Sequence, residues 1–272
     1  IQGETYEQVI EFGVNEVVVG KGYYGTNSRY SLILKNDGSL WATGQNDSGQ
    51  LGDGTNENKN GFLQTIDSGI KGISAGSYHS LVLKEDGSLW ATGDNFWGQL
   101  GNGNNNDKCI YVEVINSGVK EISAGGQHSL ILKEDGSLWG TGLNVHGELG
   151  NGSFFPMNNW IEIIDSGIKH ISAGGNHSLI LKEDGSLWAT GYNSYGQLGD
   201  GSNVEKYEFV QIIDSGVQRI SAGCKHSLIL KEDGSLWGAG HNDYGELGDG
   251  SYVDKNTFVQ IIDSGVQRIS AG

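Results

Sequence analysis

A segment of 21 residues, 171–191, recurs along the chain and constrains its fold more than any other feature. Close copies occupy residues 73–93, 122–142 and 220–240, and a looser copy occupies residues 17–44. One serine keeps its place in every copy, at intervals of 49 residues: Ser31, Ser80, Ser129, Ser178 and Ser227. A fixed period of this size is typical of supersecondary units that stack on one another, so we predict a repeat protein.

Each repeat contains four segments with the composition of short β-strands. In the last complete copy these segments are residues 208–213, 217–223, 226–231 and 235–240. They are rich in apolar and β-branched residues, and none has the 3.6-residue period of an amphipathic helix. The pair Asp233 and Gly234 predicts a tight hairpin between the last two segments, because both central positions of a type I′ turn favour positive φ.

We therefore expect an all-β fold, a β-propeller of four-stranded antiparallel blades. The long polar link that begins at Gly240 is interpreted as the return from the outer edge of one blade to the inner edge of the next. The single predicted domain, 1–272, holds five full repeats and a half repeat: approximately 6–55, 61–104, 110–153, 159–202, 208–251 and the partial 257–272. Both ends supply the same half of a unit, so we expect either a fragment of a larger propeller or an irregular closure.

The net charge of −16 limits the classes of partner. Nucleic-acid-binding proteins carry basic patches, because contacts to phosphates supply much of their affinity, and anionic membranes attract the same residues. We expect a protein partner with a neutral or basic surface, no nucleic acid and no membrane. No apolar run approaches the roughly 20 residues needed to cross a bilayer. The chain begins at Ile1 with neither a signal peptide nor a methionine, which indicates a processed or truncated N-terminus and leaves the compartment open.

Four histidines recur with the repeat: His79, His128, His177 and His226. Equivalent positions on packed sheets lie about 10 Å apart, whereas one zinc ion joins nitrogens only about 3–4 Å apart. The serine that follows each histidine points to the opposite face of its strand, so the two do not form a catalytic couple. We interpret the histidines as structural groups. The repeated tryptophans are interpreted as packing between blades: Trp41, Trp90, Trp139, Trp188 and Trp237.

The sequence contains no other pattern that indicates catalysis or cofactor binding. Loops such as 249–254 lack the spacing and the distal glutamate of a calcium-binding loop, and turn chemistry accounts for their Asp, Gly and Ser residues. There is no phosphate-binding loop, dinucleotide fingerprint or Cys-x-x-Cys. Cys109 and Cys224 lie at different positions of non-adjacent repeats and are expected to be free thiols. We expect no catalytic residue, no cofactor and no metal ligand, and hence no enzyme.

Alternate turns of a meander fall at opposite ends of the strands. The Asp-Ser-Gly turns and Asp-Gly hairpins are expected at one end, which also carries Glu85, Glu134, Glu183 and Glu232 and is expected to be acidic. The short loops before the histidines and the long Gly-x-Asn-x-x-Gly loops are expected at the other end, where the repeats differ. Exposed aromatic residues favour an interaction surface there. The candidate partner-binding residues are Tyr23, Tyr24, Tyr78, Phe96, Trp97, His146, Tyr192, Tyr195, His241 and Tyr244.

The pattern Ala-Gly-x-x-His-Ser-Leu-x-Leu, followed by Asp-Gly-x-Leu-Trp-x-x-Gly-x-Asn-x-x-Gly-Gln-Leu-Gly, resembles the repeat of the RCC1 (regulator of chromosome condensation) family in its bacterial RCC1-like form. The resemblance covers Val17 to Gly272 and implies a propeller, for which seven blades would suit the family. Propellers of that family serve as exchange factors, light sensors, enzyme inhibitors and scaffolds, so the fold does not determine the function.

We expect a non-enzymatic propeller that binds a folded protein through its aromatic loop face. Three other hypotheses stay open. The first is a regulator of an enzyme, either a GTPase exchange factor or an inhibitor of a secreted enzyme. The second is a carbohydrate or surface-adhesion module, because tyrosine and tryptophan also stack on sugars. The third is a repeat scaffold with no partner of its own.

Overall fold

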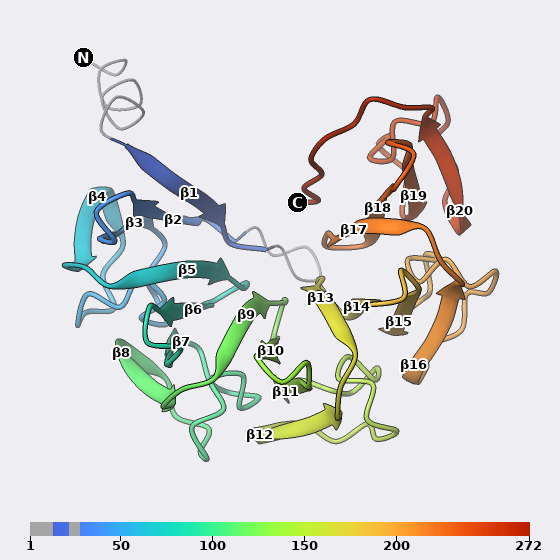
Figure 1. Cartoon of the computed structure of the whole chain (residues 1–272). Coiled ribbons are helices and arrows are strands. Elements are labelled where there is room, and N and C mark those ends of the chain that lie inside the picture. Colours follow the sequence, from blue (N-terminus) through green and yellow to red (C-terminus); the bar gives the residue numbers. More distant parts are fainter. Residues whose placement is uncertain (1–12, 22–27) are drawn as a thin grey trace.

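The computed structural model describes residues 13–21 and 28–272, which form five antiparallel sheets of four strands each. These first to fifth sheets follow one another along the chain around a common centre, with the sheets of β1 and β17 at the two ends of the arc (Figure 1). The expected all-β propeller architecture is confirmed. None of the described residues belongs to a helix that is long and apolar enough to cross a membrane.

Within each sheet the strands are ordered as in the sequence, from the centre outward (Figure 1). The innermost strands are β1 (Val14–Val19), β5 (Ile70–Ala75), β9 (Val119–Ala124), β13 (Ile168–Ala173) and β17 (Val217–Ala222). The second strands are β2 (Tyr30–Lys35), β6 (His79–Lys84), β10 (His128–Lys133), β14 (His177–Lys182) and β18 (His226–Lys231). The third strands are β3 (Leu40–Gly44), β7 (Leu89–Gly93), β11 (Leu138–Gly142), β15 (Leu187–Gly191) and β19 (Leu236–Gly240). The outermost strands are β4 (Lys59–Ile66), β8 (Lys108–Ile115), β12 (Met157–Ile164), β16 (Lys206–Ile213) and β20 (Lys255–Ile262).

The second strand of a central sheet is buried on both faces, because a sheet packs on each side of it. In β10, Leu130 and Leu132 belong to the core shared with the fourth sheet, whereas Ile131 belongs to the core shared with the second. The tryptophans extend these cores toward the preceding sheet, as predicted for inter-blade packing: Trp90, Trp139, Trp188 and Trp237. A lysine lies over each of these rings, and the Lys133 Nζ lies 3.6 Å from the centre of the Trp139 ring.

The grouping of strands differs by one strand from the expected one. Residues 208–213 belong to β16, which pairs with β15 of the fourth sheet, and not to the sheet that contains 217–223. The short Asp-Ser-Gly turn therefore carries the chain from one sheet to the next, while the long polar loop stays within one sheet. The expected grouping, in which the long loop joins two blades, is wrong. It assumed that a longer loop must connect strands that lie farther apart.

The turn is short because the two sheets converge where their hairpins meet. Val217 N donates to Gly185 O of the fourth sheet, and Glu232 N of the fifth sheet donates to Gly216 O in the turn itself. The long loop needs its length for another contact. Gly201 N donates to Asn256 O at 2.7 Å, which fastens the loop of the fourth sheet onto the outer strand of the fifth.

The end of the chain occupies the place of an inner strand after the fifth sheet. Ala271 N donates to Ser221 Oγ at 2.9 Å, as Ala222 N does to Ser172 Oγ one repeat earlier. Cys224 N likewise donates to Gly272 O. The half repeat that the sequence predicts at residues 257–272 thus divides into the outer strand of the fifth sheet and a segment lying beside β17.

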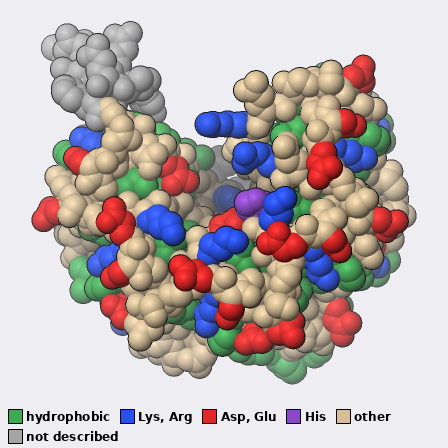
Figure 2. All heavy atoms as spheres, in the orientation of Figure 1, with side chains coloured by type: hydrophobic (Ala, Val, Ile, Leu, Met, Phe, Trp, Pro, Cys, Tyr) green, Lys and Arg blue, Asp and Glu red, His purple; other side chains and the backbone are tan. Residues whose placement is uncertain are grey.

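The end of the sheets that carries the Asp-Ser-Gly turns exposes the expected acidic side chains together with several basic ones. All four predicted glutamates are exposed there, and Lys71, Lys120 and Arg219, each two or three residues after such a turn, are exposed as well. The face in Figure 2 shows Lys and Arg side chains interspersed with Asp and Glu. Positive and negative side chains are therefore mixed on the face seen in Figure 2.

Candidate functional site

Each long loop is built around one buried asparagine, which positions the variable side chains. In the fourth sheet Asn193 Nδ2 donates to Asp200 Oδ1 at 3.0 Å and to the carbonyl oxygens of Ser202 and Val204, while its Oδ1 accepts from Leu198 N at 3.0 Å. The same pattern holds at Asn144 and Asn242. Because the asparagine satisfies several backbone groups at once, the loop is rigid without regular secondary structure.

The short and long loops lie at the same end of the sheets, as predicted. Tyr192 N at the start of a long loop donates to Asn176 O in the short loop at 2.8 Å, and Asp94 N makes the same bond to Tyr78 O. This pairing follows from the antiparallel register of the second and third strands, in which His177 faces Gly191. The residues that vary between repeats are therefore collected on one end, here called the loop face.

Five of the predicted residues form a continuous row of rings on the loop face. The ring centres of His146 and Tyr192 are 4.9 Å apart, those of Tyr192 and Tyr195 6.2 Å, those of Tyr195 and His241 4.8 Å, and those of His241 and Tyr244 6.2 Å. Edge and tilted contacts at these distances are the favoured arrangements of aromatic pairs. The aromatic row, as we call these five residues, crosses the third, fourth and fifth sheets.

Carboxylates lie directly behind and beside the aromatic row. Glu148 is fully buried, where it accepts from His146 N at 2.9 Å and from Asn176 Nδ2 at 3.1 Å. Burial raises the pKa of the Glu148 carboxyl. His146 Nδ1 lies 2.8 Å from Glu205 Oε1, and His241 Nδ1 lies 2.7 Å from Glu246 Oε1.

Sequence reasoning missed these carboxylates, although a signal was present. Glu148 and Glu246 stand where the other repeats have Gln50, Gln99 and Gln197, so Gly-Glu-Leu-Gly replaces Gly-Gln-Leu-Gly in the two repeats whose loops carry a row histidine.

The chemistry of the aromatic row suits a cationic group. One cation is already present, because the Lys225 Nζ lies 4.9 Å from the centre of the Tyr195 ring. Aromatic faces attract ammonium and guanidinium groups, and adjacent carboxylates strengthen the binding by charge-assisted hydrogen bonds. Tyr244 is 86% exposed, so one end of the row is open to a partner.

The other predicted residues lie apart from the row. Phe96, 67% exposed, and Trp97 contact each other edge to face with ring centres 5.0 Å apart. Tyr78 is half-buried and lines a shallow hollow with Arg29 and Lys59 on the first two sheets. The remaining two candidates, Tyr23 and Tyr24, lie outside the described residues.

A second exposed aromatic group was not among the predicted residues. Phe154 and Phe155 have ring centres 4.5 Å apart, and Tyr207 lies 6.5 Å from Phe154. Both phenylalanines are more than half exposed. Two adjacent phenylalanines in a polar loop were the available signal, because no other repeat has two aromatic residues at these positions.

The repeated histidines bond to serines, but to those of the next sheet. His79 Nε2 lies 2.8 Å from Ser129 Oγ, and the same contact joins His128 to Ser178 and His177 to Ser227. Because the Ser129 hydroxyl donates its proton to Gln99 O at 2.8 Å, the histidine must be the donor. A serine that accepts from histidine is not activated as a nucleophile, so the contact is structural.

A comparison with curated proteins finds no match. Solved structures resemble the chain in fold. Human WBSCR16 is 23% identical with a TM-score of 0.83, and the match covers 95% of this chain and 70% of that one. Yeast RCC1 (Prp20), in a crystal structure with Kap60, is 20% identical with a TM-score of 0.82, covering 95% and 66%. Prp20p from Saccharomyces cerevisiae, in a structure described with its binding properties to Gsp1p and histones, is 22% identical with a TM-score of 0.79, covering 95% and 67%.

The chain thus spans about two thirds of the length of these proteins, and identities this low establish the fold alone. A stronger match comes from a family model. The model of the RCC1-like domain matches residues 25–272, the same part of the chain in which the histidine, tryptophan and asparagine positions repeat. Because that match extends over nearly the whole length of the chain, the chain belongs to the RCC1-like domain family.

Proposed function

We propose that this propeller is a non-enzymatic protein-binding module that contacts a basic region of a folded partner through the aromatic row. The observation that carries the proposal is the unbroken series of ring contacts from His146 to Tyr244, flanked by Glu148, Glu205 and Glu246. Tyrosine-rich surfaces with a charged margin are typical of protein interfaces.

Charge supports a basic protein over a nucleic acid. The chain carries a net charge of −16, and the carboxylates beside the row would repel a phosphate backbone. The propeller Prp20 has been crystallised with Kap60 and studied for binding to Gsp1p and histones, so propellers of this fold include binders of other proteins. Those partners belong to Prp20, and the partner of the present chain is proposed only by its chemistry.

The test compares three forms of the chain in affinity capture from the source cells, read by quantitative mass spectrometry. The variant Tyr195→Ala/Tyr244→Ala removes two rings of the row. The control Phe154→Ala/Phe155→Ala removes two exposed rings outside it. We expect basic proteins that the wild type and the control both retain and that the row variant loses, with retention weakening as salt rises. The proposal is wrong if the row variant retains the same partners.

A further inference from the structure

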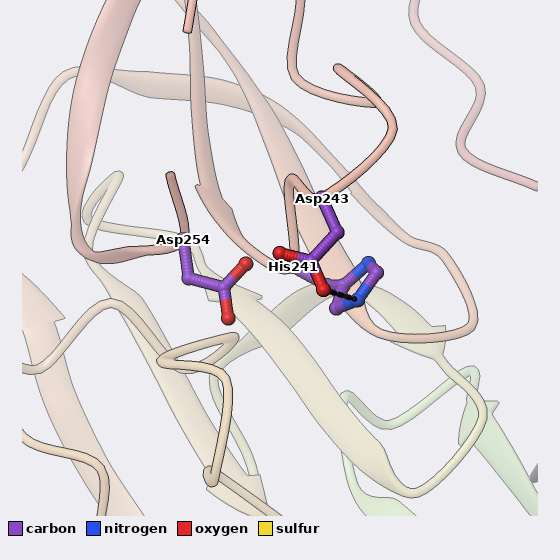
Figure 3. A group of neighbouring side chains, drawn as sticks. All are labelled: His241, Asp243 and Asp254. Carbon is purple, nitrogen blue, oxygen red and sulfur yellow. Dashed lines mark ion pairs between the residues drawn. The ribbon is translucent and has the colours of Figure 1, made fainter. Parts of the chain in front are cut away.

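One loop of the fifth sheet brings together three side chains with the donor atoms of a metal site. His241 directly follows β19, Asp243 lies two residues further, and Asp254 directly precedes β20, so both ends of the loop contribute. The ring nitrogen and carboxylate oxygens of the three residues lie within 4.8 Å of one another. In Figure 3 the Asp243 carboxylate lies against the His241 ring, and the Asp254 carboxylate points toward the same space.

Two of the three side chains are held in place by bonds that leave a donor atom available. The His241 Nδ1 is 2.7 Å from Glu246 Oε1, which directs Nε2 toward Asp243 at 3.4 Å. Asp254 Oδ1 accepts from the backbone N of Asn242 at 2.7 Å, so its second oxygen remains for a ligand. A histidine that donates one ring N–H to a carboxylate and offers the other nitrogen is the arrangement found around protein-bound zinc.

We propose that His241, Asp243 and Asp254 bind a divalent transition-metal ion, for which Zn²⁺ is the first choice. Ligands at zinc–nitrogen and zinc–oxygen distances of about 2.0–2.2 Å lie roughly 3.4 Å apart in a tetrahedron. The His241 to Asp243 distance already has this value. All three donor atoms already lie within 4.8 Å of one another, so small side-chain movements bring the third ligand to the same distance, and the Asp243 side chain is 67% exposed and has room to turn. One imidazole and two carboxylates favour a transition metal over calcium, which takes oxygen ligands only.

The other four loops provide an internal comparison, because none of them has this donor set at the same repeat positions. The corresponding residues are Gln45, Asp47 and Asn58; Asp94, Phe96 and Asp107; Leu143, Val145 and Pro156; Tyr192, Ser194 and Glu205. The backbone bond made by Asp254 recurs at Asn58 and Asp107, so it belongs to the loop. The histidine is particular to the fifth repeat, and only there does it stand together with aspartates at both other positions.

The inference goes beyond the expectation drawn from the sequence. The sequence led us to expect no metal ligand anywhere in the chain, from arguments about the repeated histidines and the Asp-Gly loops, and the present proposal departs from that expectation. A bound ion would join the two ends of the loop beneath Tyr195 and Tyr244, whose rings lie 4.8 and 6.2 Å from that of His241. The ion would therefore hold part of the loop face, whether or not that face binds a protein.

The experiment titrates the full chain with Zn²⁺ in competition with a chromophoric chelator. We expect one equivalent bound by the wild type and a loss of tenfold or more in affinity for His241→Ala and for Asp254→Asn. Glu246→Gln should weaken binding by about 10–100-fold, because it removes the carboxylate that orients the ring. Asp94→Asn alters the position that corresponds to His241 in the second repeat and should bind as the wild type does.

Two outcomes would overturn the proposal. In the first, the wild type binds no Zn²⁺, and the group then only holds the His241 ring between carboxylates. In the second, His241→Ala binds Zn²⁺ as tightly as the wild type, which would place the ion elsewhere, for instance at Cys109 or Cys224. Unchanged thermal unfolding of the metal-free variants shows that any loss of binding does not come from loss of the fold.

Discussion

His79 of the second sheet donates through Nε2 to Ser129 of the third, whose own hydroxyl proton is given to Gln99 of the second sheet. One hydroxyl thus joins a strand and a long loop of one sheet to the neighbouring sheet. All three residues are fully buried. The bond repeats between successive sheets, so it acts as a link from blade to blade.

Ser129→Ala should destabilise the chain, because it leaves the buried His79 N–H and the Gln99 carbonyl without partners. We expect a loss of about 1–3 kcal/mol in the free energy of unfolding, measured by urea denaturation. Ser31→Ala is the matched control, since Ser31 holds the same repeat position in the first sheet and no described histidine bonds to it. Equal losses in the two variants would contradict the assignment.

Stability should fall as the pH drops below about 6.5, because the buried histidines stay neutral in the folded chain. Burial lowers the pKa of His79 and of His177 to about 3 and that of His128 well below its usual value. The unfolded chain binds protons from about pH 6.5 downward, so each such residue costs about 1.4 kcal/mol per pH unit until its folded pKa is reached.

Two kinds of carboxyl group also change the stability of the folded chain in this range of pH or below it. Burial raises the pKa of Glu148, so as the pH falls the folded chain takes up this proton before the unfolded chain does. Glu148 therefore favours folding increasingly as the pH falls toward 4.5. Asp135 has its pKa lowered by hydrogen bonds from Ser137 and loses that stabilisation only below about pH 4. Urea titrations at pH 7, 6 and 5 should show a shallower decline for His177→Gln than for the wild type. Identical slopes would count against a neutral buried His177.

Gly125→Ala should be strongly destabilising. A Cβ at this position would overlap the His128 ring and lie 2.7 Å from Gly174 O, and neither the ring nor the backbone has room to move. We expect a loss of about 1–3 kcal/mol or more, as for other overpacked cores, measured by thermal or urea unfolding. Gly61→Ala, where no atom lies within 4 Å of the added carbon, should change stability by less than about 0.5 kcal/mol.

Asn193→Ala should loosen the long loop of the fourth sheet and with it the centre of the aromatic row. The change leaves Leu198 N and the carbonyl oxygens of Ser202 and Val204 without their side-chain partner. We expect a cost of about 1–3 kcal/mol for each buried group that finds no new partner, and faster amide hydrogen exchange in residues 194–205. Ser194→Ala, at an exposed position of the same loop, serves as control and should preserve the slow exchange.

The sequence alone determined the strands, the tight turns and the end of the sheets on which the variable loops lie. These features depend on local chemistry and on parity: an Asp-Gly hairpin requires its own φ angles, and a meander alternates its turns. The same residues recur at a fixed period, so the strands and turns predicted for one repeat apply to every repeat. That is why the fold class and the RCC1-like resemblance followed from the repeat.

Tertiary structure decided which strands share a sheet. The Asp-Ser-Gly turn lies where two sheets converge, and a turn of the same length could equally join two strands of one sheet. Tertiary structure also decided that His79 bonds to Ser129, 50 residues away, and that His146, Tyr192, Tyr195, His241 and Tyr244 meet while Phe96 and Trp97 stand apart. Such contacts depend on the angle between neighbouring sheets and on side-chain rotamers. Both are set by packing across blades, which sequence spacing does not encode.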